Sequence, residues 1–419
     1  MISNRKINDF VNIFKKSEKE RDKFKIGIEL EHYILNEDLS AISYQENNGI
    51  KDILHNLTNK GWDPVYKNNK LFEINKNNNT VTLEPGGQLE LSIKPVKKIS
   101  TMNNIYLSFL TDIMPILNKN NQFLVTLGYQ PITPINKIKL LPRKRYFYMH
   151  KYLTQKGKMA SHMMKGTASI QVNIDYENEE DYKKKYIIST FLVPIIYTFF
   201  DNSPFFQSDL IEGGSLRAKI WNNTDSHRCG LYNNFSYKKY ARFLLNTPPI
   251  IIKNKKGIHY TGDTDLKKLY DLNSNFFHEH ILTMVFPEIR TKNYIEIRSC
   301  DSLPYPQNLG YVAFIKNIFY NKQNLNTIYE IARKNNFSSI KSMYKQVIEN
   351  NIPSEVSKKG EMIYKIIKNN IAEEDKKYLK YIDIYFDKIL NPRSIIQKKY
   401  RNTNKISDSI SQSIIRRNN

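Results

Sequence analysis

The stretch Thr82–Ser92, TLEPGGQLELS, places two glutamates, Glu84 and Glu90, on either side of a Pro-Gly-Gly turn. Proline and glycine in this order favour a sharp reversal of the backbone. After the turn, apolar and polar residues alternate over residues 87–95, GQLELSIKP, and a period of two predicts a half-buried β-strand. The stretch therefore predicts a turn into a strand that brings two carboxylates together, in a chain whose formal net charge is +23.

Three more segments show the same alternation: IGIELEHYI (26–34), SIQVNID (169–175) and NYIEIRSCD (293–301). One face of each segment is apolar and suits the packing of helices, whereas the other face carries acids, amides and an arginine. We interpret these polar faces as the base of a binding site, with an ordinary solvated sheet face as the alternative. Helices are predicted between the strands, over residues 3–23, 100–118, 182–200 and 308–334.

The composition limits the class of protein. Two cysteines, Cys229 and Cys300, cannot build a disulfide framework, and we expect a buried thiol and a strand residue rather than a redox switch. The N-terminus has no apolar signal core, and the longest apolar run, 187–200, is too short to cross a bilayer and contains Pro194. That run predicts a buried helix or helix pair, and we expect a soluble cytoplasmic protein.

The positive charge has two interpretations. The lysines are spread over the whole chain, and Lys, Asn and Ile are all used heavily, as in proteins of AT-rich genomes. We therefore attribute the charge to composition. A nucleic-acid-binding or nucleic-acid-cleaving protein is the alternative, and it predicts one continuous basic patch beside the acids.

Acidic side chains gather on or beside three of the predicted strands: Glu29, Glu31, Glu84, Glu90 and Glu296. If these strands are neighbours, so many like charges cannot all stay ionised without cations. Oxygen-only ligands favour Mg²⁺ or Mn²⁺, and Mg²⁺ usually completes its shell with phosphate oxygens. Since the sequence has neither a P-loop nor a strand–GxGxxG–helix unit, a nucleotide such as ATP would lie on the sheet surface. Arg217, Arg228 and Arg298 would suit its phosphates or a substrate carboxylate, with plain ion pairs as the alternative.

A set of motifs in residues 24–305 resembles the glutamate–cysteine ligases of plants and many proteobacteria. In order, the motifs are IGIELEHYIL, GWDPVY, TLEPGGQLELSIKP, LGYQP, KRYFYMHKYL, HMMKGTASIQVNID, DNSPF, SLRAKIW…TDSHRCG, HILTMVFPEIRTKNYIEIRSCD and LP. The resemblance implies an α+β fold of the glutamine synthetase/guanidino kinase type, in which a curved antiparallel sheet forms a funnel with helices packed outside.

The resemblance also implies an activity, the ATP-dependent ligation of the glutamate γ-carboxylate to the amine of L-cysteine. The reaction would pass through γ-glutamyl phosphate and begin glutathione biosynthesis, with Mg²⁺ (or Mn²⁺) as cofactor. Glutamate, cysteine and ATP would be the partners of a monomer or homodimer, without nucleic acid or membrane. A related ligase with another amine acceptor, of the ergothioneine type, is the alternative.

The roles that the resemblance implies fall on particular residues of this chain. The metal-binding acids would be Glu29, Glu31, Glu84, Glu90 and Glu296, and the catalytic arginines would be Arg217 and Arg298. Substrate or nucleotide contacts are implied for Gln171, Asn173, Arg228, Met163, Met164 and Tyr146. Gly166 stands where the plant and proteobacterial pattern has an arginine, which leaves the recognition of acceptor or glutamate open. A decayed homologue is disfavoured, because all five acids and the main arginines are present.

A change in composition suggests three parts of the chain. Residues 1–321 are predicted as the catalytic ligase domain. After about residue 322 Lys, Asn, Ile and Glu dominate, which predicts a C-terminal helical region, 322–401, packed on that domain. Residues 402–419 are polar and are predicted to be a frayed tail.

Overall fold

A large antiparallel sheet organises the chain in the computed structural model, which describes residues 4–254, 257–269 and 275–415. Eight of its strands are neighbours in this order: β14 (Ile289–Thr291), β15 (Ile295–Asp301), β7 (Ser169–Ile174), β1 (Ile26–Asn36), β5 (Leu89–Val96), β4 (Asn79–Leu83), β3 (Lys70–Lys76) and β2 (Asp63–Lys67). Strand β6 (Gln122–Val125) pairs with the second half of β1, and β16 (Ile414–Ile415) pairs with β6. The four strands predicted from alternation are β1, β5, β7 and β15, so those predictions are confirmed.

The turn between β4 and β5 forms as predicted. The Gly87 N–H donates to the Glu84 carbonyl at 2.9 Å, and Gly87 has a φ of +89°, which favours glycine. A Cβ on Gly86 would lie 2.4 Å from the carbonyl oxygen of Lys165, so this position also needs glycine. The two glycines let a tight hairpin approach helix α5 (Ala160–Gly166) closely.

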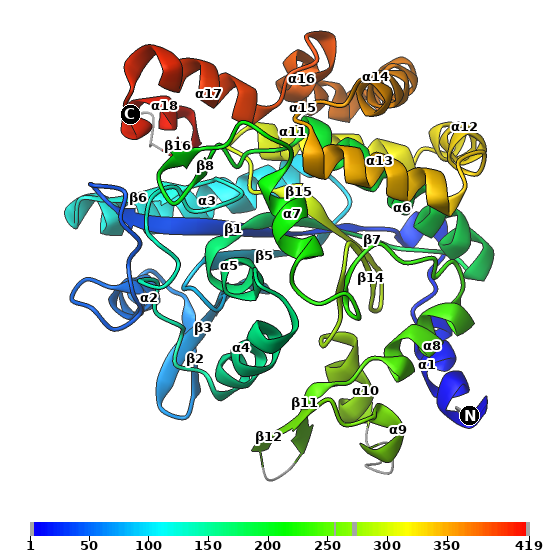
Figure 1. The fold of residues 1–419 in the computed structure, drawn as a ribbon, viewed down its shortest axis with the longest axis horizontal. Coiled ribbons are helices and arrows are strands. Elements are labelled where there is room, and N and C mark those ends of the chain that lie inside the picture. The colour runs from blue at the N-terminus through cyan, green and yellow to red at the C-terminus, as the bar shows by residue number, and fades with distance from the viewer. Residues whose placement is uncertain (1–3, 255–256, 270–274, 416–419) are drawn as a thin grey trace.

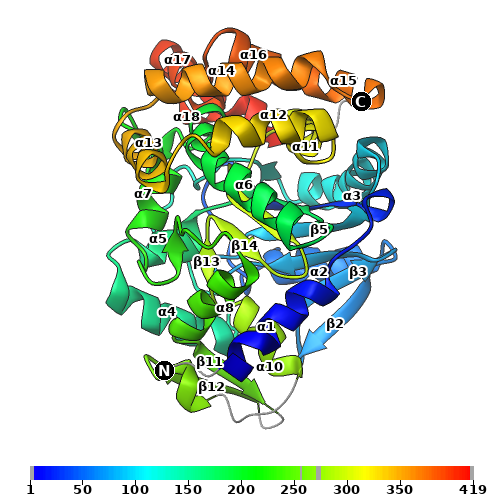
Figure 2. The same cartoon turned by 90° about the vertical axis from the view of Figure 1, so that its right-hand side faces the viewer.

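Helices cover the apolar face of the sheet in two layers (Figures 1 and 2). The inner layer contains α3 (Ile99–Lys119), α6 (Glu179–Phe199) and α11 (Gln307–Phe319). The outer layer contains α12 (Lys322–Ala332), α13 (Phe337–Glu349), α14 (Ser354–Asn369), α15 (Lys376–Leu379), α16 (Asp383–Asp387) and α17 (Pro392–Thr403). The main apolar core of the described residues runs from Ile7 to Ile415, and a smaller cluster includes Ile396 of α17, so the C-terminal helices share the cores of the sheet domain.

The remaining elements lie mainly on the polar side of the sheet and at its ends (Figure 1). They are α1 (Asn4–Lys16), α2 (Ile50–Thr58), α4 (Lys144–Lys156), α5, β8 (Phe205–Phe206), β9 (Asp209–Leu210), α7 (Leu216–Asn222), β10 (Cys229–Gly230), α8 (Tyr237–Asn246), β11 (Ile250–Asn254), β12 (Gly257–Gly262), α9 (Leu266–Leu269), α10 (Asn275–Leu282), β13 (Phe286–Pro287) and α18 (Ile406–Ser409). Short 3₁₀ turns occur at Arg21–Lys23, Glu373–Asp375, Lys380–Ile382 and Ser411–Ser413. The architecture confirms the predicted α+β class, an antiparallel sheet with helices packed outside.

Two helix predictions were too long. The helix predicted over 308–334 is divided into α11 and α12, because the Asn321 side chain accepts the Asn324 N–H at 3.1 Å and caps a new helix start. The helix predicted over 3–23 ends at Lys16 and is followed by the short 3₁₀ turn. The apolar run around Pro194 is one buried helix, α6, and no helix in the described ranges is long and apolar enough to span a bilayer.

The prediction of a frayed tail is wrong for residues 402–415. Ile410 is buried, the Thr126 N–H donates to the Ser413 carbonyl at 2.8 Å, and β16 then adds to the edge of β6. Three apolar residues, at positions 410, 414 and 415, are buried against the end of the sheet. The prediction was based on the overall polarity of the segment and did not take these three residues into account. Residues 416–419 lie outside the described residues.

Candidate active site

A cavity of about 450 Å³ lies on the polar face of the sheet, and β1, β5 and β7 form its base. The β4–β5 turn, α4, α5, α7 and the β14–β15 hairpin contribute its walls. Four carboxylates line it, from Glu29, Glu31, Glu84 and Glu90. Six cationic side chains line it as well, from Arg143, Arg145, Arg217, Arg290, Lys292 and Arg298. The cavity therefore brings concentrated negative and positive charge into one space.

Strand register explains why the glutamates meet. Glu29 and Glu31 are two residues apart on β1 and thus share a face. Glu31 lies directly opposite Glu90 of β5, and Glu29 lies opposite Gln171 of β7. Glu84 enters from the turn that precedes β5. The predicted neighbourhood holds for β1 and β5, whereas β15, which carries Glu296, is separated from β1 by β7.

The pKa values of three cavity glutamates are raised, because the carboxylates are buried and lie close to one another. Burial, together with the charge of Glu84, raises the pKa of Glu31 to about 7. Burial also raises the pKa of Glu84, although Arg143 and Arg298 oppose the rise. For Glu90, burial and the charges of Glu29, Glu84 and Glu31 raise the pKa well above its usual value. A cation bound among these oxygens would relieve the repulsion.

Glu296 differs from the other four glutamates. Its carboxylate accepts from Arg290 Nε at 2.5 Å and from Arg298 Nη1 at 2.9 Å, and Lys292 Nζ lies 2.9 Å away. Burial alone would raise the pKa of Glu296, but these three cations hold it well below its usual range. Glu296 is therefore engaged with cations behind the cavity wall, because the β14–β15 register sets it directly opposite Arg290.

The five predicted metal-binding glutamates are divided in the structure: four line the cavity, whereas Glu296 is paired with three cations. Within the described part of the chain, no three Asp, Glu, His or Cys side chains come together as a set that could hold a metal ion. The remaining donors still suit Mg²⁺, since this ion is usually held by one or two carboxylates while waters and substrate phosphates complete its octahedron. Glu29, Glu31, Glu84 and Glu90 supply only oxygen donors, three of them hydrogen-bonded to neighbouring hydroxyl or amide groups.

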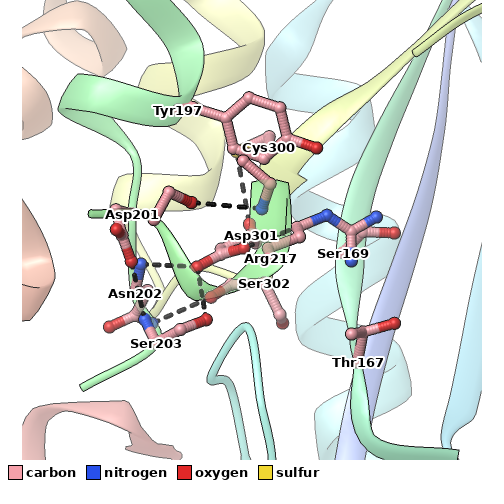
Figure 3. Close-up of polar contacts among 12 residues, drawn as sticks. Thr167, Ser169, Tyr197, Asp201, Asn202, Ser203, Arg217, Cys300, Asp301 and Ser302 are labelled. Carbon is pink, nitrogen blue, oxygen red and sulfur yellow. Dashed lines mark hydrogen bonds and ion pairs between the residues drawn. The ribbon is translucent and has the colours of Figure 1, made fainter. Parts of the chain in front are cut away.

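Arg217 of α7 lines the cavity although it is only 2% exposed. Its Nη2 donates to the Arg298 carbonyl at 3.2 Å, whereas Nε and Nη1 have no hydrogen-bond partner. The nearest carboxylate, that of Asp301, lies 3.9 Å from Nε (Figure 3). Buried donors are rarely left unpaired, so this guanidinium suits an anionic ligand.

Arg298 faces the same region of the cavity. Its Nη1 donates to Gln171 Oε1 and to Glu296, and its Nε is buried without a partner. The guanidinium carbons of Arg217 and Arg298 lie 5.1 and 5.6 Å from the centre of the Trp221 ring, which stacks near both. Two arginines and one indole thus form a donor-rich wall.

The amides connect the charged groups. Gln171 donates to Glu31 Oε1 at 2.9 Å while it accepts from Arg298, so it couples a carboxylate to a guanidinium. Asn173 donates to Glu29 Oε1 at 3.2 Å and lines an adjoining cavity of about 340 Å³, which shares Glu29 with the first. The structure thus brings both predicted amides beside the carboxylates.

Three further predicted residues line the cavity. Met163 and Met164 of α5 form part of its apolar wall. Tyr146 of α4 also faces it, with its hydroxyl donating to the Leu83 carbonyl at 2.8 Å.

The two cysteines are free and buried, as predicted.

The structure does not bring Arg228 to the cavity, although a substrate or nucleotide contact was predicted for it. This arginine is fully buried, and its donors reach Asp225 Oδ2 at 2.7 Å, the Met284 carbonyl at 2.8 Å and the Tyr152 hydroxyl at 3.2 Å. It is absent from the cavity wall and joins α4, the Asp225 loop and the segment before β13. The sequence could have indicated this ion pair, because Asp225 precedes Arg228 by three residues in the stretch TDSHR.

Several cavity residues were missed from the sequence: Arg143, Arg145, Trp221, Arg290 and Lys292. Trp221 follows Arg217 by four residues, a spacing that places both on one face of a helix and could have indicated it. The other four carried no comparable signal, because lysine and arginine are frequent throughout the chain.

The fold and the cavity define a class of protein in which an antiparallel sheet presents carboxylates, and the surrounding walls present arginines, to one cavity. The chain belongs to glutamate-cysteine ligase family 2 (GCS2), whose sequence profile matches residues 25–345.

Relatives with established names are similar over the same region. The chain is 30% identical over 326 residues to glutamate–cysteine ligase A, chloroplastic, of Oryza sativa subsp. indica, covering 74% of this chain and 66% of that protein. It is 28% identical over 328 residues to the chloroplastic glutamate–cysteine ligase of Arabidopsis thaliana, covering 75% of this chain and 62% of that protein. The chain thus spans slightly less than two thirds of the length of these relatives.

The fold is also similar to a solved structure. The crystal structure of glutamate–cysteine ligase from Francisella tularensis in complex with AMP superposes with a TM-score of 0.59 at 15% identity. The superposition covers 93% of this chain and 87% of that chain. At this identity the likeness shows a common fold.

Proposed function

We propose that this protein catalyses the ATP-dependent ligation of the glutamate γ-carboxylate to the amine of L-cysteine. The observation that carries the proposal is the cavity in which four glutamates face six cationic side chains. Such a site can hold a nucleotide's phosphates and an amino acid's carboxylates together. The names of the plant relatives and the AMP bound to the Francisella enzyme support the choice of substrates.

Mg²⁺ or Mn²⁺ would be held by one or two carboxylates from the group of Glu29, Glu31, Glu84 and Glu90. Such a cation, when bound, neutralises carboxylate and phosphate charge and so favours the approach of an anionic nucleophile. Glu296 is not needed in this set, because Arg290, Lys292 and Arg298 already neutralise it.

The reaction has two steps. A γ-carboxylate oxygen of glutamate attacks the γ-phosphorus of ATP, so ADP leaves and γ-glutamyl phosphate forms. The cysteine amine then attacks the acyl carbon, loses a proton and expels phosphate as the amide bond forms. The chain contributes mainly by positioning the reactants and stabilising charge.

Individual residues have distinct parts in this scheme. Arg217 and Arg298, with unpaired donors beside Trp221, hold a carboxylate of glutamate. Arg143, Arg145, Arg290 and Lys292 offer positive charge to the phosphates from the other walls. Met163, Met164 and Tyr146 exclude water from one side of the cavity.

A coupled assay for ADP release tests the proposal. Purified protein is given ATP, Mg²⁺ and glutamate with cysteine or with one of a panel of other amines, and the dipeptide product is identified by mass spectrometry. We expect release to be fastest with cysteine. If ADP release is no faster with cysteine than with the other amines, the assignment of cysteine as the acceptor is wrong. Salt-dependent retention of DNA without ATP turnover would favour the nucleic-acid-binding alternative.

A second candidate, a related ligase with a different amine acceptor, is favoured by the surroundings of Gly166. A Cβ at this position would lie 2.5 Å from the Tyr129 ring and 3.1 Å from Ile135. The arginine of the plant and proteobacterial pattern therefore has no room here, and Tyr129 occupies the space. Faster ADP release with another amine in the same panel would support this candidate.

A further inference from the structure

The helix that carries Arg217 and Trp221 has little stability of its own. Helix α7 contains seven residues, and isolated helices of this length do not persist in water. Its position, and therefore the position of the Arg217 guanidinium, depends on contacts from other parts of the fold. The C-terminal helices make several of these contacts.

Helix α13 packs against the start of α7. The N–H of Ser215, which caps α7, donates to the Val347 carbonyl at 2.8 Å. A Cβ on Gly214 would lie 2.3 Å from the carbonyl oxygens of Val347 and Ile348. The backbone before α7 is thus in close contact with the end of α13.

Tyr344 adds a second connection from α13. Its hydroxyl donates to Glu288 Oε1 at 3.0 Å and lies 3.5 Å from the carbonyl of Ala218, the neighbour of Arg217. Glu288 is 4% exposed and also accepts from the Tyr197 hydroxyl at 2.9 Å. Glu288 and Arg217 attract one another electrostatically, so Tyr344 contacts both the backbone of α7 and a carboxylate that faces its arginine.

Arg393 of α17 reaches the same point from another direction. Its Nη1 donates to the Gly214 carbonyl and its Nη2 to the Gly213 carbonyl, each at 2.8 Å. The Arg393 guanidinium is fully buried and pairs with Asp201 Oδ2 at 3.4 Å. A bidentate arginine of this kind fixes geometry as well as charge.

Asp201 begins the segment that supports Asp301 behind Arg217 (Figure 3). The N–H of Asn202 and the hydroxyl of Ser203 both donate to Asp301 Oδ2 at 2.7 Å. The other oxygen, Oδ1, lies 3.9 Å from Arg217 Nε. The connection from Arg393 to the buried side of Arg217 is therefore continuous.

We propose that Tyr344 and Arg393 are positioning residues for Arg217, and that residues 322–401 act on the active site by holding α7 in place. We call the contacts of Tyr344, Val347 and Arg393 with residues 213–218 the α7 clamp. The inference rests on the proposed function only where it takes Arg217 to bind a carboxylate of glutamate. Loosening the clamp moves the guanidinium and weakens glutamate binding, whereas ATP is held mainly by other residues.

The variants Y344F and R393K test the clamp. Y344F removes one hydroxyl, and R393K keeps the charge but loses the bidentate donors. The matched control is Y364F, which removes a hydroxyl bonded to Asp383 in the same helical region, with no contact to the α7 clamp. Steady-state kinetics are measured for glutamate, ATP and cysteine, and hydrogen exchange is measured for backbone amides of residues 213–222.

We expect the KM for glutamate to rise about five- to tenfold in Y344F and R393K, the effect of one ordinary hydrogen bond. The KM for ATP should stay within about twofold, and exchange at 213–222 should be faster than in Y364F. A KM for glutamate equal to that of Y364F, or unchanged exchange at 213–222, would overturn the proposal. If R393K does not fold, Y344F decides.

The two proposals fail in different ways. If the wild-type protein shows no ADP release with glutamate and any amine, the proposed function fails. Hydrogen exchange at 213–222 then decides the clamp by itself, since that readout needs no substrate.

Discussion

Replacing Glu90 with Gln should inactivate the protein and stabilise its metal-free form at the same time. Glu90 Oε1 accepts from the hydroxyls of Thr82 and Ser92 at 3.0 and 3.3 Å, and a glutamine carbonyl can keep both contacts. The substitution removes one negative charge from the group of Glu29, Glu31, Glu84 and Glu90. It therefore removes a metal ligand and a source of repulsion with little change in shape.

The size of the stabilisation follows from linkage. Burial and neighbouring carboxylates raise the pKa of Glu90 well above the usual 4.5, so above that pH the folded protein binds more protons at this group than the unfolded chain does. Each pH unit above 4.5 then costs about 1.4 kcal/mol, which amounts to at most about 3 kcal/mol at pH 7. The cost is absent below pH 4.5 and grows as the pH rises, because the folded state binds the extra proton.

Thermal melting in EDTA at pH 5 and pH 7 measures the effect. With an unfolding entropy of about 2.1 cal/mol/K per residue, ~3 kcal/mol in a chain of 419 residues corresponds to about 3 °C. We expect E90Q to melt up to about 3 °C above the wild type at pH 7 and less than about 1 °C above it at pH 5. The control E361Q, on α14 of the outer helical layer, should melt like the wild type at both pH values.

Turnover in the ADP-release assay should fall at least about a hundredfold in E90Q, since losing even an indirect support of a metal site costs 10–100-fold. E361Q should keep full activity. Wild-type turnover in E90Q would refute the metal role, and a melting difference that is the same at pH 5 and pH 7 would refute the electrostatic reasoning.

Three further substitutions or deletions test other parts of the structure. G166A should lower the free energy of unfolding by about 1–3 kcal/mol, because the new methyl group meets the Tyr129 ring, and denaturant unfolding measures this. R228K should lower the free energy of unfolding by about 3 kcal/mol, because the hydrogen bond and ion pair with Asp225 are lost, and should leave the KM for glutamate unchanged. A raised KM for glutamate would instead support the predicted substrate contact of Arg228. Deletion of residues 402–419 should lower the melting temperature by several degrees, because β6 loses the strand paired to its outer edge. An unchanged melting temperature would instead support the prediction that this tail is frayed.

Local patterns predicted much of the fold. The alternation in β1, β5, β7 and β15 identified each strand and the face that holds its acids or amides, because successive side chains on a strand point to opposite faces. The Pro-Gly-Gly turn likewise predicted the position of Glu84. Helix ends were less predictable, since one asparagine, Asn321, divided an apolar pattern that continued on both sides.

The site was predicted less completely than the strands. Glu29, Glu31, Glu84 and Glu90 meet as expected, but Glu296 pairs with Arg290, a residue whose approach depends on the register of a short hairpin. Residue type also grouped Arg228 with Arg217 as possible partners of an anion, although Arg228 is fully paired and Arg217 has free donors. Whether a buried charged side chain is paired depends on residues from several parts of the fold, so the local sequence around that residue does not predict it.

The amino-acid sequence by itself determined which residues share a strand face, where the chain turns, and that several acids gather beside arginines, because these properties depend on neighbours within a few residues. Only the tertiary structure decided which carboxylates lack a cationic partner. It also decided that the Thr126 N–H donates to the Ser413 carbonyl and that the Arg393 guanidinium donates to the Gly214 carbonyl. Those contacts join segments far apart in the chain, and their positions follow from how the helices pack over the whole sheet.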